Sequence, residues 1–229
     1  MNALQKITLW VAFVLGVEFN LRAQVTIAFC KLEGGCKFYQ TQYTYAQLDG
    51  MFNYLGTFEK DKGTLVFFRN KQNQDVHYPD KKRSLKELHA YFGGKGEPLI
   101  SKGSIAPFEA IIQPENGLWE AITETPAAKN CSPQLATQLE GIAGLKNGNK
   151  NFKKPFTPED LLPPQTPWLT TAPNVYKAIV LPETKPTIKS VYDFQVVSPQ
   201  EIQGTLRMSF QIPSQTVCEV TTNFTFKRK

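Results

Sequence analysis

Two histidines, with the carboxylates near them, are the side chains in this sequence best suited to chemistry. His77 lies between Asp75 and Asp80, and residues 75 and 77 would face the same side of a strand. Such a group could transfer protons or bind a metal ion, although so few ligands do not define a site. Polar residues also gather at strand ends because these ends are solvated, so a solvent-exposed turn is the simpler interpretation.

The spacings typical of common catalytic sites are missing from the sequence. It contains no Gly-x-Ser-x-Gly turn, which would indicate a serine hydrolase. Glu109, Glu120 and Asp193 are candidate carboxylates for glycoside cleavage, but the sequence does not set their separations in space. We therefore predict no catalytic residue, no metal ligand and no cofactor. A secreted hydrolase with an unrecognised site remains an alternative.

The four cysteines are better explained as disulfides than as metal ligands. A zinc site is disfavoured because the sequence has no Cys-x-x-Cys and only two histidines that could assist. An even number of cysteines in an exported chain indicates two disulfides, with three possible pairings. We favour Cys30 with Cys36, on neighbouring arms of a predicted hairpin, and Cys131 with Cys218, which would close a much longer loop.

Residues 1–23 follow the plan of a cleaved signal peptide. Lys6 precedes an apolar run of eleven residues, 7–17, and a polar stretch ends at Ala23. This run is too short to span a bilayer, which takes about 20 residues. We expect cleavage after Ala23, a secreted, periplasmic or cell-surface location, and no membrane span in the mature chain. A buried N-terminal helix is the alternative interpretation.

The mature chain, residues 24–229, has the size and composition of one globular domain. Hydrophobic residues make up 41% of the whole sequence, which disfavours disorder. The formal net charge is +6, but the basic residues are dispersed and do not alternate with aromatic residues. Nucleic-acid binding is therefore not expected, and the sequence does not indicate an oligomeric state.

The first half of the mature chain predicts short strands and one helix. Ser84 and Glu87 form a capping box, in which each side chain binds the backbone N–H of the other residue, before a helix over Leu85–Phe92. His89 would lie beside the apolar face of this helix, where packing is the more common role of a histidine. The predicted strands are Val25–Phe29 and Lys37–Tyr45, which form a hairpin, followed by Gly63–Arg69 and Asp75–Tyr78.

A second hairpin is expected in the middle of the chain. Phe108–Ile112 and Leu118–Thr123 flank a Pro-Glu-Asn-Gly turn, in which proline presets a negative φ and asparagine or glycine tolerates a positive one. Trp119 is expected to anchor the core side of this hairpin.

A second helix and a linker are expected after this hairpin. The helix starts at Ser132, which is followed by proline, and carries an apolar stripe up to Leu145. The basic, glycine-containing stretch 148–154 is the best candidate for an exposed linker. Within the single β-rich domain, this stretch suggests possible sub-layers over 24–147 and 155–229.

The last 55 residues show the clearest pattern. From Glu201 to Ile212 apolar residues alternate with polar ones, a period of two that indicates one buried and one solvated face. Cys218 falls on the buried face of the last strand, where it could meet Cys131. The predicted strands are Val175–Leu181, Val191–Val197, Glu201–Ile212 and Thr216–Lys227.

Together these elements predict an α+β fold. It is mainly antiparallel β-sheet, with a meander over the C-terminal 55 residues, and two short amphipathic helices pack on it. Trp119, Cys131, Val197–Pro199, Ile202–Leu206 and Cys218 form a loose pattern in the second half of the chain. In this pattern the chain resembles exported bacterial β-rich domains of unassigned function. The resemblance implies export and a disulfide, and it implies no activity.

These patterns favour an exported binding or structural protein over an enzyme. A sheet with helices laid on it can enclose an apolar cavity for a small apolar ligand, although such interiors are more often simply filled. A surface adhesion or interaction module is the alternative. Sequons at Asn130 and Asn223 would matter only in a host that glycosylates exported proteins. The side chains expected to line the apolar pocket are Tyr192, Phe194, Leu206, Met208, Phe210, Phe224 and Phe226.

Overall fold

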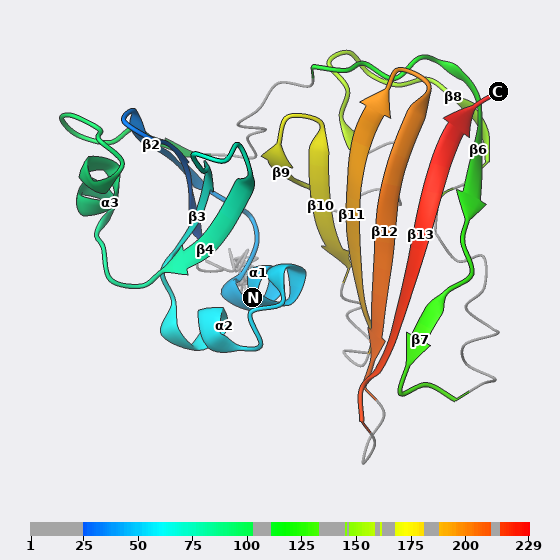
Figure 1. Cartoon of the computed structure of the whole chain (residues 1–229), viewed down its shortest axis with the longest axis horizontal. Coiled ribbons are helices and arrows are strands. Elements are labelled where there is room, and N and C mark those ends of the chain that lie inside the picture. Colours follow the sequence, from blue (N-terminus) through cyan, green and yellow to red (C-terminus); the bar gives the residue numbers. More distant parts are fainter. Residues whose placement is uncertain are drawn as a thin grey trace, which may run out of the picture.

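The computed structural model of the protein describes residues 25–102, 111–132, 145, 147–158, 161, 168–180, 188–211 and 216–229. In these residues two β-sheets lie side by side (Figure 1). We call them, with their helices, the N-terminal lobe (25–102) and the C-terminal lobe (111–229). The predicted α+β class, dominated by antiparallel strands, is confirmed. The predicted signal peptide and most of the helix predicted after Ser132 lie outside the described residues.

The N-terminal lobe contains a mixed sheet. Its described strands are β1 (Thr26–Lys31), β2 (Gly35–Gln40), β3 (Thr64–Arg69), β4 (Asp75–Asp80) and β5 (Ile100–Lys102), in the spatial order β4-β3-β1-β2-β5. The predicted hairpin forms from antiparallel β1 and β2, and β4 runs antiparallel to β3. β3 lies parallel to β1, and β5 lies parallel to β2. Parallel neighbours need long crossover connections, and helices form part of both crossovers.

The helix α1 (Tyr45–Phe52) replaces part of a predicted strand. The prediction of a strand over Lys37–Tyr45 is wrong beyond Gln40, where β2 ends. Thr44 caps α1: its hydroxyl accepts a hydrogen bond from the backbone N–H of Gln47 at 3.2 Å, and the Gln47 side chain accepts one from the backbone N–H of Thr44 at 2.8 Å. This capping box outweighs the β propensity of the tyrosines around it.

The short helix α2 (Thr57–Asp61) is held against α1 by the buried carboxylate of Asp49. Its two oxygens accept hydrogen bonds from the backbone N–H groups of Gly56, Phe58 and Glu59 at 2.7 to 3.0 Å. A helix start leaves such donors without an internal partner, so the carboxylate satisfies them and fixes the two helices as one block.

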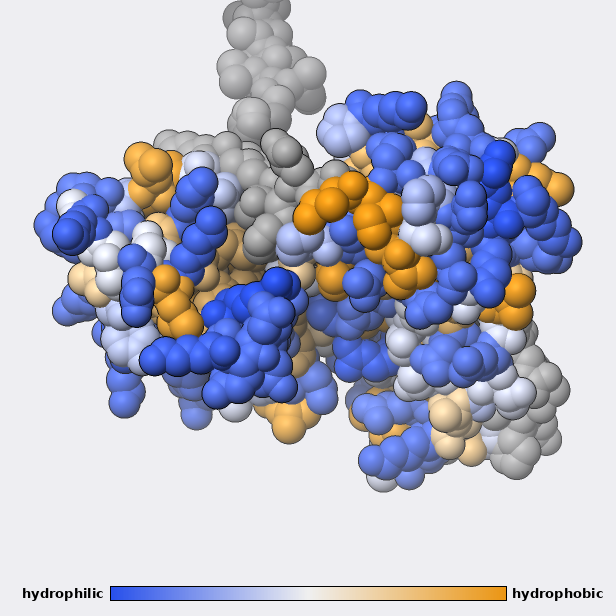
Figure 2. All heavy atoms as spheres, turned by 45° about the horizontal axis from the view of Figure 1, so that its top comes forward, coloured by the Kyte–Doolittle hydropathy of each residue, from blue (hydrophilic) through white to orange (hydrophobic). Residues whose placement is uncertain are grey.

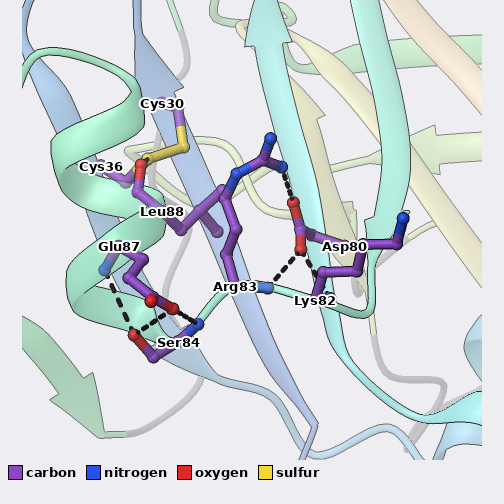
Figure 3. Close-up of polar contacts among 8 residues, drawn as sticks. All are labelled: Cys30, Cys36, Asp80, Lys82, Arg83, Ser84, Glu87 and Leu88. Carbon is purple, nitrogen blue, oxygen red and sulfur yellow. Dashed lines mark hydrogen bonds and ion pairs between the residues drawn. A yellow bond between two sulfur atoms is a disulfide. The ribbon is translucent and has the colours of Figure 1, made fainter.

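The helix α3 (Leu85–Tyr91) covers one face of the N-terminal sheet. The start of this helix is tied to the end of β4 (Figure 3). The capping box of Ser84 and Glu87 forms as predicted. The buried Asp80 carboxylate pairs with the guanidinium of Arg83 and also accepts a hydrogen bond from the Arg83 backbone N–H at 2.9 Å. Leu88, on the buried side of α3, then packs over the Cys30–Cys36 disulfide.

The C-terminal lobe contains one large sheet. Its described strands are β6 (Gly117–Thr123), β7 (Ala127–Lys129), β8 (Gly148–Lys150), β9 (Leu169–Ala172), β10 (Val175–Val180), β11 (Ile188–Ser198), β12 (Glu201–Phe210) and β13 (Cys218–Arg228). Their spatial order is β8-β6-β13-β12-β11-β10-β9, and β7 also pairs with β13. From β9 to β13 each strand pairs antiparallel with the next, which confirms the predicted C-terminal meander.

Two predictions for the middle of the chain are wrong. Ile111 and Ile112, the described end of the predicted strand Phe108–Ile112, form no ladder with β6, whose neighbours among the described residues, β8 and β13, both come from later in the chain. The stretch 148–154 is not an exposed linker, since it begins with β8 and then buries Phe152 against Trp119, with ring centroids 5.4 Å apart. Its polar residues are solvated because β8 is an edge strand. The two sheets divide the chain between β5 and β6, earlier than the predicted sub-layer boundary.

One face of the C-terminal sheet, which we call the inner face, is a close-packed core. Trp119 is fully buried there, as predicted. Gly204 leaves room for its neighbours, because a Cβ at this position would lie 2.4 Å from Cζ of Phe224 and 2.6 Å from Cβ of Phe194. The Cys131–Cys218 disulfide forms, and it ties the chain after β7 to this face.

The helix α1 joins the two lobes by packing on the opposite, outer face of the C-terminal sheet. This face contributes Leu169, Ile179 and Val191 to an apolar core that it shares with α1 and the N-terminal sheet. Gly50 of α1 permits the close approach, since a Cβ there would lie 3.2 Å from Cδ1 of Ile179. The lobes are therefore in contact at α1.

Replacing Gly50 by Phe should push the lobes apart, because the added ring has no room beside Ile179. We expect the free energy of unfolding to fall by about 1 to 3 kcal/mol. Small-angle X-ray scattering should show a larger radius of gyration. The control is Ala46→Phe, at an exposed position of the same helix, which should change stability by less than about 0.5 kcal/mol. Wild-type stability and scattering in Gly50→Phe would contradict this packing.

The two disulfides should differ in their effect on stability, because their cysteines are separated by 87 residues in one case and by 6 in the other. In the chain-entropy model, Cys131→Ser with Cys218→Ser costs about 4 to 5 kcal/mol, and Cys30→Ser with Cys36→Ser costs about 2 kcal/mol. Chemical denaturation of the two double variants measures the difference. A larger loss for the Cys30 and Cys36 variant would show that loop closure is not the main effect.

Candidate functional site

A cavity of about 830 Å³ lies between the two lobes. One wall comes from β1 to β4 and the end of α1, and the other wall comes from β9 and β10. Figure 2 shows apolar surface around the junction of the lobes, whereas most of the surface farther away is hydrophilic. This volume lies within the range of about 300 to 1,000 Å³ that small-molecule sites occupy in proteins.

Aromatic rings form the floor of the cavity, which we define as Phe29, Tyr39, Phe52 and Phe67. Phe29 and Phe67 stack with ring centroids 5.0 Å apart, and Phe52 meets Phe67 edge to face at 5.5 Å. Three of the rings come from neighbouring strands, where every second side chain faces the C-terminal lobe, and Phe52 comes from α1. Rings packed in this way form a rigid apolar surface.

Two polar pairs, one from each lobe, meet at one side of this floor. Nδ1 of His77 lies 2.7 Å from the hydroxyl of Tyr54. On the C-terminal lobe, the ammonium group of Lys177 forms an ion pair with Asp193 and lies 5.5 Å from the centroid of the Phe52 ring. A cation over a ring face is attracted by the ring quadrupole, so the aromatic floor helps to hold Lys177.

Burial and charge act together on the two basic groups. Burial lowers the pKa of Lys177, whereas the charge of Asp193 and its hydrogen bond to the ammonium act in the opposite direction. Partial burial among the rings lowers the pKa of His77, the positive charge of Lys177 lowers it further, and Asp193 opposes both effects. These surroundings favour the neutral form of His77, and the cationic group beside it is compensated by a carboxylate.

The structure separates His77 from the two carboxylates that lie near it in the sequence. His77 lines the cavity, where it bonds to Tyr54. Asp75 also lines the cavity but pairs with Arg69, with 2.9 Å between Nε and Oδ1. Asp80 is buried at the far end of β4, where the turn before α3 occupies its carboxylate. The three residues therefore do not form one acid–base or metal cluster.

His89 and the first disulfide lie at another part of the cavity wall. Nδ1 of His89 accepts a hydrogen bond from the backbone N–H of Cys36 at 3.0 Å, so this histidine packs against the hairpin. Cys30 and Cys36 are direct partners in the β1–β2 register, and both line the cavity. The disulfide thus closes the hairpin end that borders the cavity.

The residues predicted to line an apolar pocket lie elsewhere, on the inner face of the C-terminal sheet. They belong to two neighbouring apolar clusters, together with Trp119, Tyr176 and Cys218. None of them lines the cavity between the lobes. They are Tyr192, Phe194, Leu206, Met208, Phe210, Phe224 and Phe226.

Glu120 and Asp193, two of the carboxylates considered for glycoside cleavage, have separate partners. Glu120 on β6 pairs with Lys229 at 2.6 Å, and Asp193 pairs with Lys177. Glu109 lies outside the described residues. The structure therefore does not bring the two described groups, Glu120 and Asp193, together across the cavity.

Three further features concern the described part of the chain. It contains no group of three or more histidine, cysteine or carboxylate side chains that could hold a metal ion. It contains no helix with the length and hydropathy of a membrane span. Both sequon asparagines, Asn130 and Asn223, are exposed, and Asn223 bonds to Thr205 on the neighbouring strand at 3.0 Å.

Known proteins offer no guide to this cavity: no family model, no curated protein and no solved structure matches the chain.

Sequence patterns missed the aromatic floor and Lys177. Phe29 and Phe67 lie in correctly predicted strands, but no pattern in the sequence shows that these strands are neighbours. Lys177 offered a weak signal, since it interrupts an apolar strand and Asp193 lies at the matching position of the next predicted strand. A hairpin register would place the two side by side, and the structure confirms that they pair.

The lowered pKa of His77 predicts a pH-dependent stability. The unfolded chain, with a histidine pKa of 6.5, binds this proton more readily than the folded protein. The contribution to stability is therefore present above pH 6.5 and is lost as the pH falls through the folded pKa. NMR titration should place the pKa of His77 below 6.5, Lys177→Met should raise it, and Asp193→Asn should lower it.

The same titration contains its own control. The protein has only two histidines, so His89→Gln leaves a single imidazole signal and assigns it to His77. His77→Gln should remove this part of the pH dependence from urea unfolding curves. A wild-type pKa at or above 6.5 would contradict the described surroundings of the ring.

Proposed function

We propose that the protein is an exported binding protein that holds a small, mainly apolar ligand in the cavity between its lobes. The observation that carries the proposal is the cavity itself, with about 830 Å³ of space over a floor of packed aromatic rings. Small-molecule sites are concave and mostly apolar, and they place a few polar groups at their sides. His77 and Lys177 are such groups here, and the Tyr54 hydroxyl holds the ring of His77.

The way the lobes are joined supports a site between them. Gly50 and its neighbours dock α1 on the outer face of the C-terminal sheet, and described residues of both lobes line the cavity beside this contact. A protein interior normally closes such a space, because unfilled volume loses packing contacts. The floor rings are packed in the core that the lobes share, and an apolar ligand in the cavity contacts the edges that this core leaves exposed.

Export is supported by the chemistry of the cysteines and by the start of the chain. Both disulfides are typical of an oxidising, extracellular-type compartment. Residues 1–23 have the order of charges and apolar residues expected of a signal peptide. The resemblance to exported bacterial β-rich domains points to the same compartment.

Binding is better supported than catalysis. A general base needs a group that orients it, and the side-chain partner of His77 is the hydroxyl of Tyr54. No carboxylate of the described residues hydrogen bonds to this imidazole. The surroundings of His77 thus resemble the wall of a binding site more than a catalytic centre.

Saturable binding of an uncharged fluorescent probe tests the proposal. N-Phenyl-1-naphthylamine should gain fluorescence with the wild-type protein. Val175→Trp should weaken this binding by about tenfold or more, equivalent to about 1.4 kcal/mol. The reason is that Val175 lines the cavity from β10, so that the indole ring takes up space the probe needs.

The control is Val197→Trp, an exposed position on the neighbouring strand β11 that does not line the cavity. This variant should bind the probe like wild type. Absence of saturable binding to the wild-type protein would contradict the proposed function. Undiminished binding to a folded Val175→Trp protein would place the probe outside this cavity.

A further inference from the structure

We infer that the ligand of this cavity is an organic carboxylate, with its apolar body on the aromatic floor and its charged group at Lys31 and Lys37. The inference rests on the proposed binding function and adds the chemical class of the ligand. Both lysines line the cavity, and both come from the β1–β2 hairpin whose rings form part of the floor.

The register of the hairpin places the two lysines on the floor side of the sheet. Lys37 is directly opposite Phe29, and Lys31 follows Phe29 by two residues on the same strand. Residues with this relation share a face, and diagonal neighbours across antiparallel strands are about 7 to 8 Å apart. Two flexible ammonium groups at that spacing can both reach one carboxylate at the edge of the floor.

The other charged groups of the lining are already paired. Arg69 forms a bidentate pair with Asp75, at 2.9 and 3.2 Å. Lys177 pairs with Asp193, and Glu97 pairs with Lys86. These pairs leave little net charge at their own positions.

Lys31, Lys37 and Lys95 differ from this group. No carboxylate of the described residues forms an ion pair with any of these three lysines. All three are exposed at the cavity wall. The lining therefore carries uncompensated positive charge around the hairpin and the segment after α3.

This distribution of charge and apolar surface fits an anionic amphiphile. A carboxylate has two oxygens that accept charge-assisted hydrogen bonds, and ammonium groups supply the donors. An apolar chain or ring extending from it contacts the exposed edges of Phe29, Tyr39 and Phe67 and is itself removed from water. A neutral ligand of the same shape would gain the burial alone, so the lysines should select between the two.

Displacement of bound N-phenyl-1-naphthylamine by dodecanoate and by dodecan-1-ol at pH 7.5 tests the inference. The two competitors have the same chain length and differ in charge. Dodecanoate should compete at lower concentration with the wild-type protein. In the double variant Lys31→Gln with Lys37→Gln its affinity should fall by about fivefold to tenfold, the size expected for two exposed ion pairs.

Three comparisons make the result specific. Dodecan-1-ol should compete within about twofold of wild type in the double variant, because its contacts are apolar. Lys60→Gln, at an exposed position of α2 outside the cavity lining, should leave both competitors unchanged. Added salt should weaken the competition by dodecanoate, because ions screen exposed charges. It should leave the competition by dodecan-1-ol unchanged.

The outcomes separate the two proposals. If the probe binds and the two competitors displace it alike, or if the double variant keeps full affinity for dodecanoate, the carboxylate inference is wrong and the binding function stands. If the uncharged probe shows no saturable binding, the proposed function and the inference both fail.

Discussion

The contact between α1 and the outer face of the C-terminal sheet is the constraint on which the site depends. The close contact is possible because Gly50 has no side chain, and it is stabilised because Ile179 and Val191 give this face an apolar patch. Asp49 fixes α1 to α2, because its carboxylate accepts hydrogen bonds from the backbone at the start of α2. Since the lobes meet at this place, the walls of the cavity are set by one helix and by the sheets that it joins.

The period of two in β-strands explains why this molecule has two different apolar regions. On the inner face of the C-terminal sheet, Trp119, Phe226 and their neighbours are closely packed, and Gly204 removes the side chain that would not fit. On the N-terminal sheet the alternation instead turns Phe29 and Phe67 toward the other lobe, where they belong to the core that the lobes share and also line the cavity. The same rule thus builds a filled core in one lobe and the floor of a cavity in the other.

Local patterns predicted much of the fold and little of the site. Alternation correctly predicted that Met208 and Cys218 face inward, and the box at Ser84 correctly predicted α3. The box at Thr44 carries the same signal for α1, but the β-branched and aromatic residues around it favoured a strand. The cavity could not be predicted, because Phe29 and Lys177, far apart in sequence, come to line one space through packing that no local pattern encodes.

The location of a bound ligand is the most direct test, and methyl NMR spectroscopy of the protein titrated with dodecanoate measures it. The account predicts saturable shifts for the methyl groups of Val175, in the cavity wall, with little change at the methyl group of Met208, on the inner face of the C-terminal sheet. Shifts confined to Met208 and its neighbours, or no saturable shift at Val175, would contradict it.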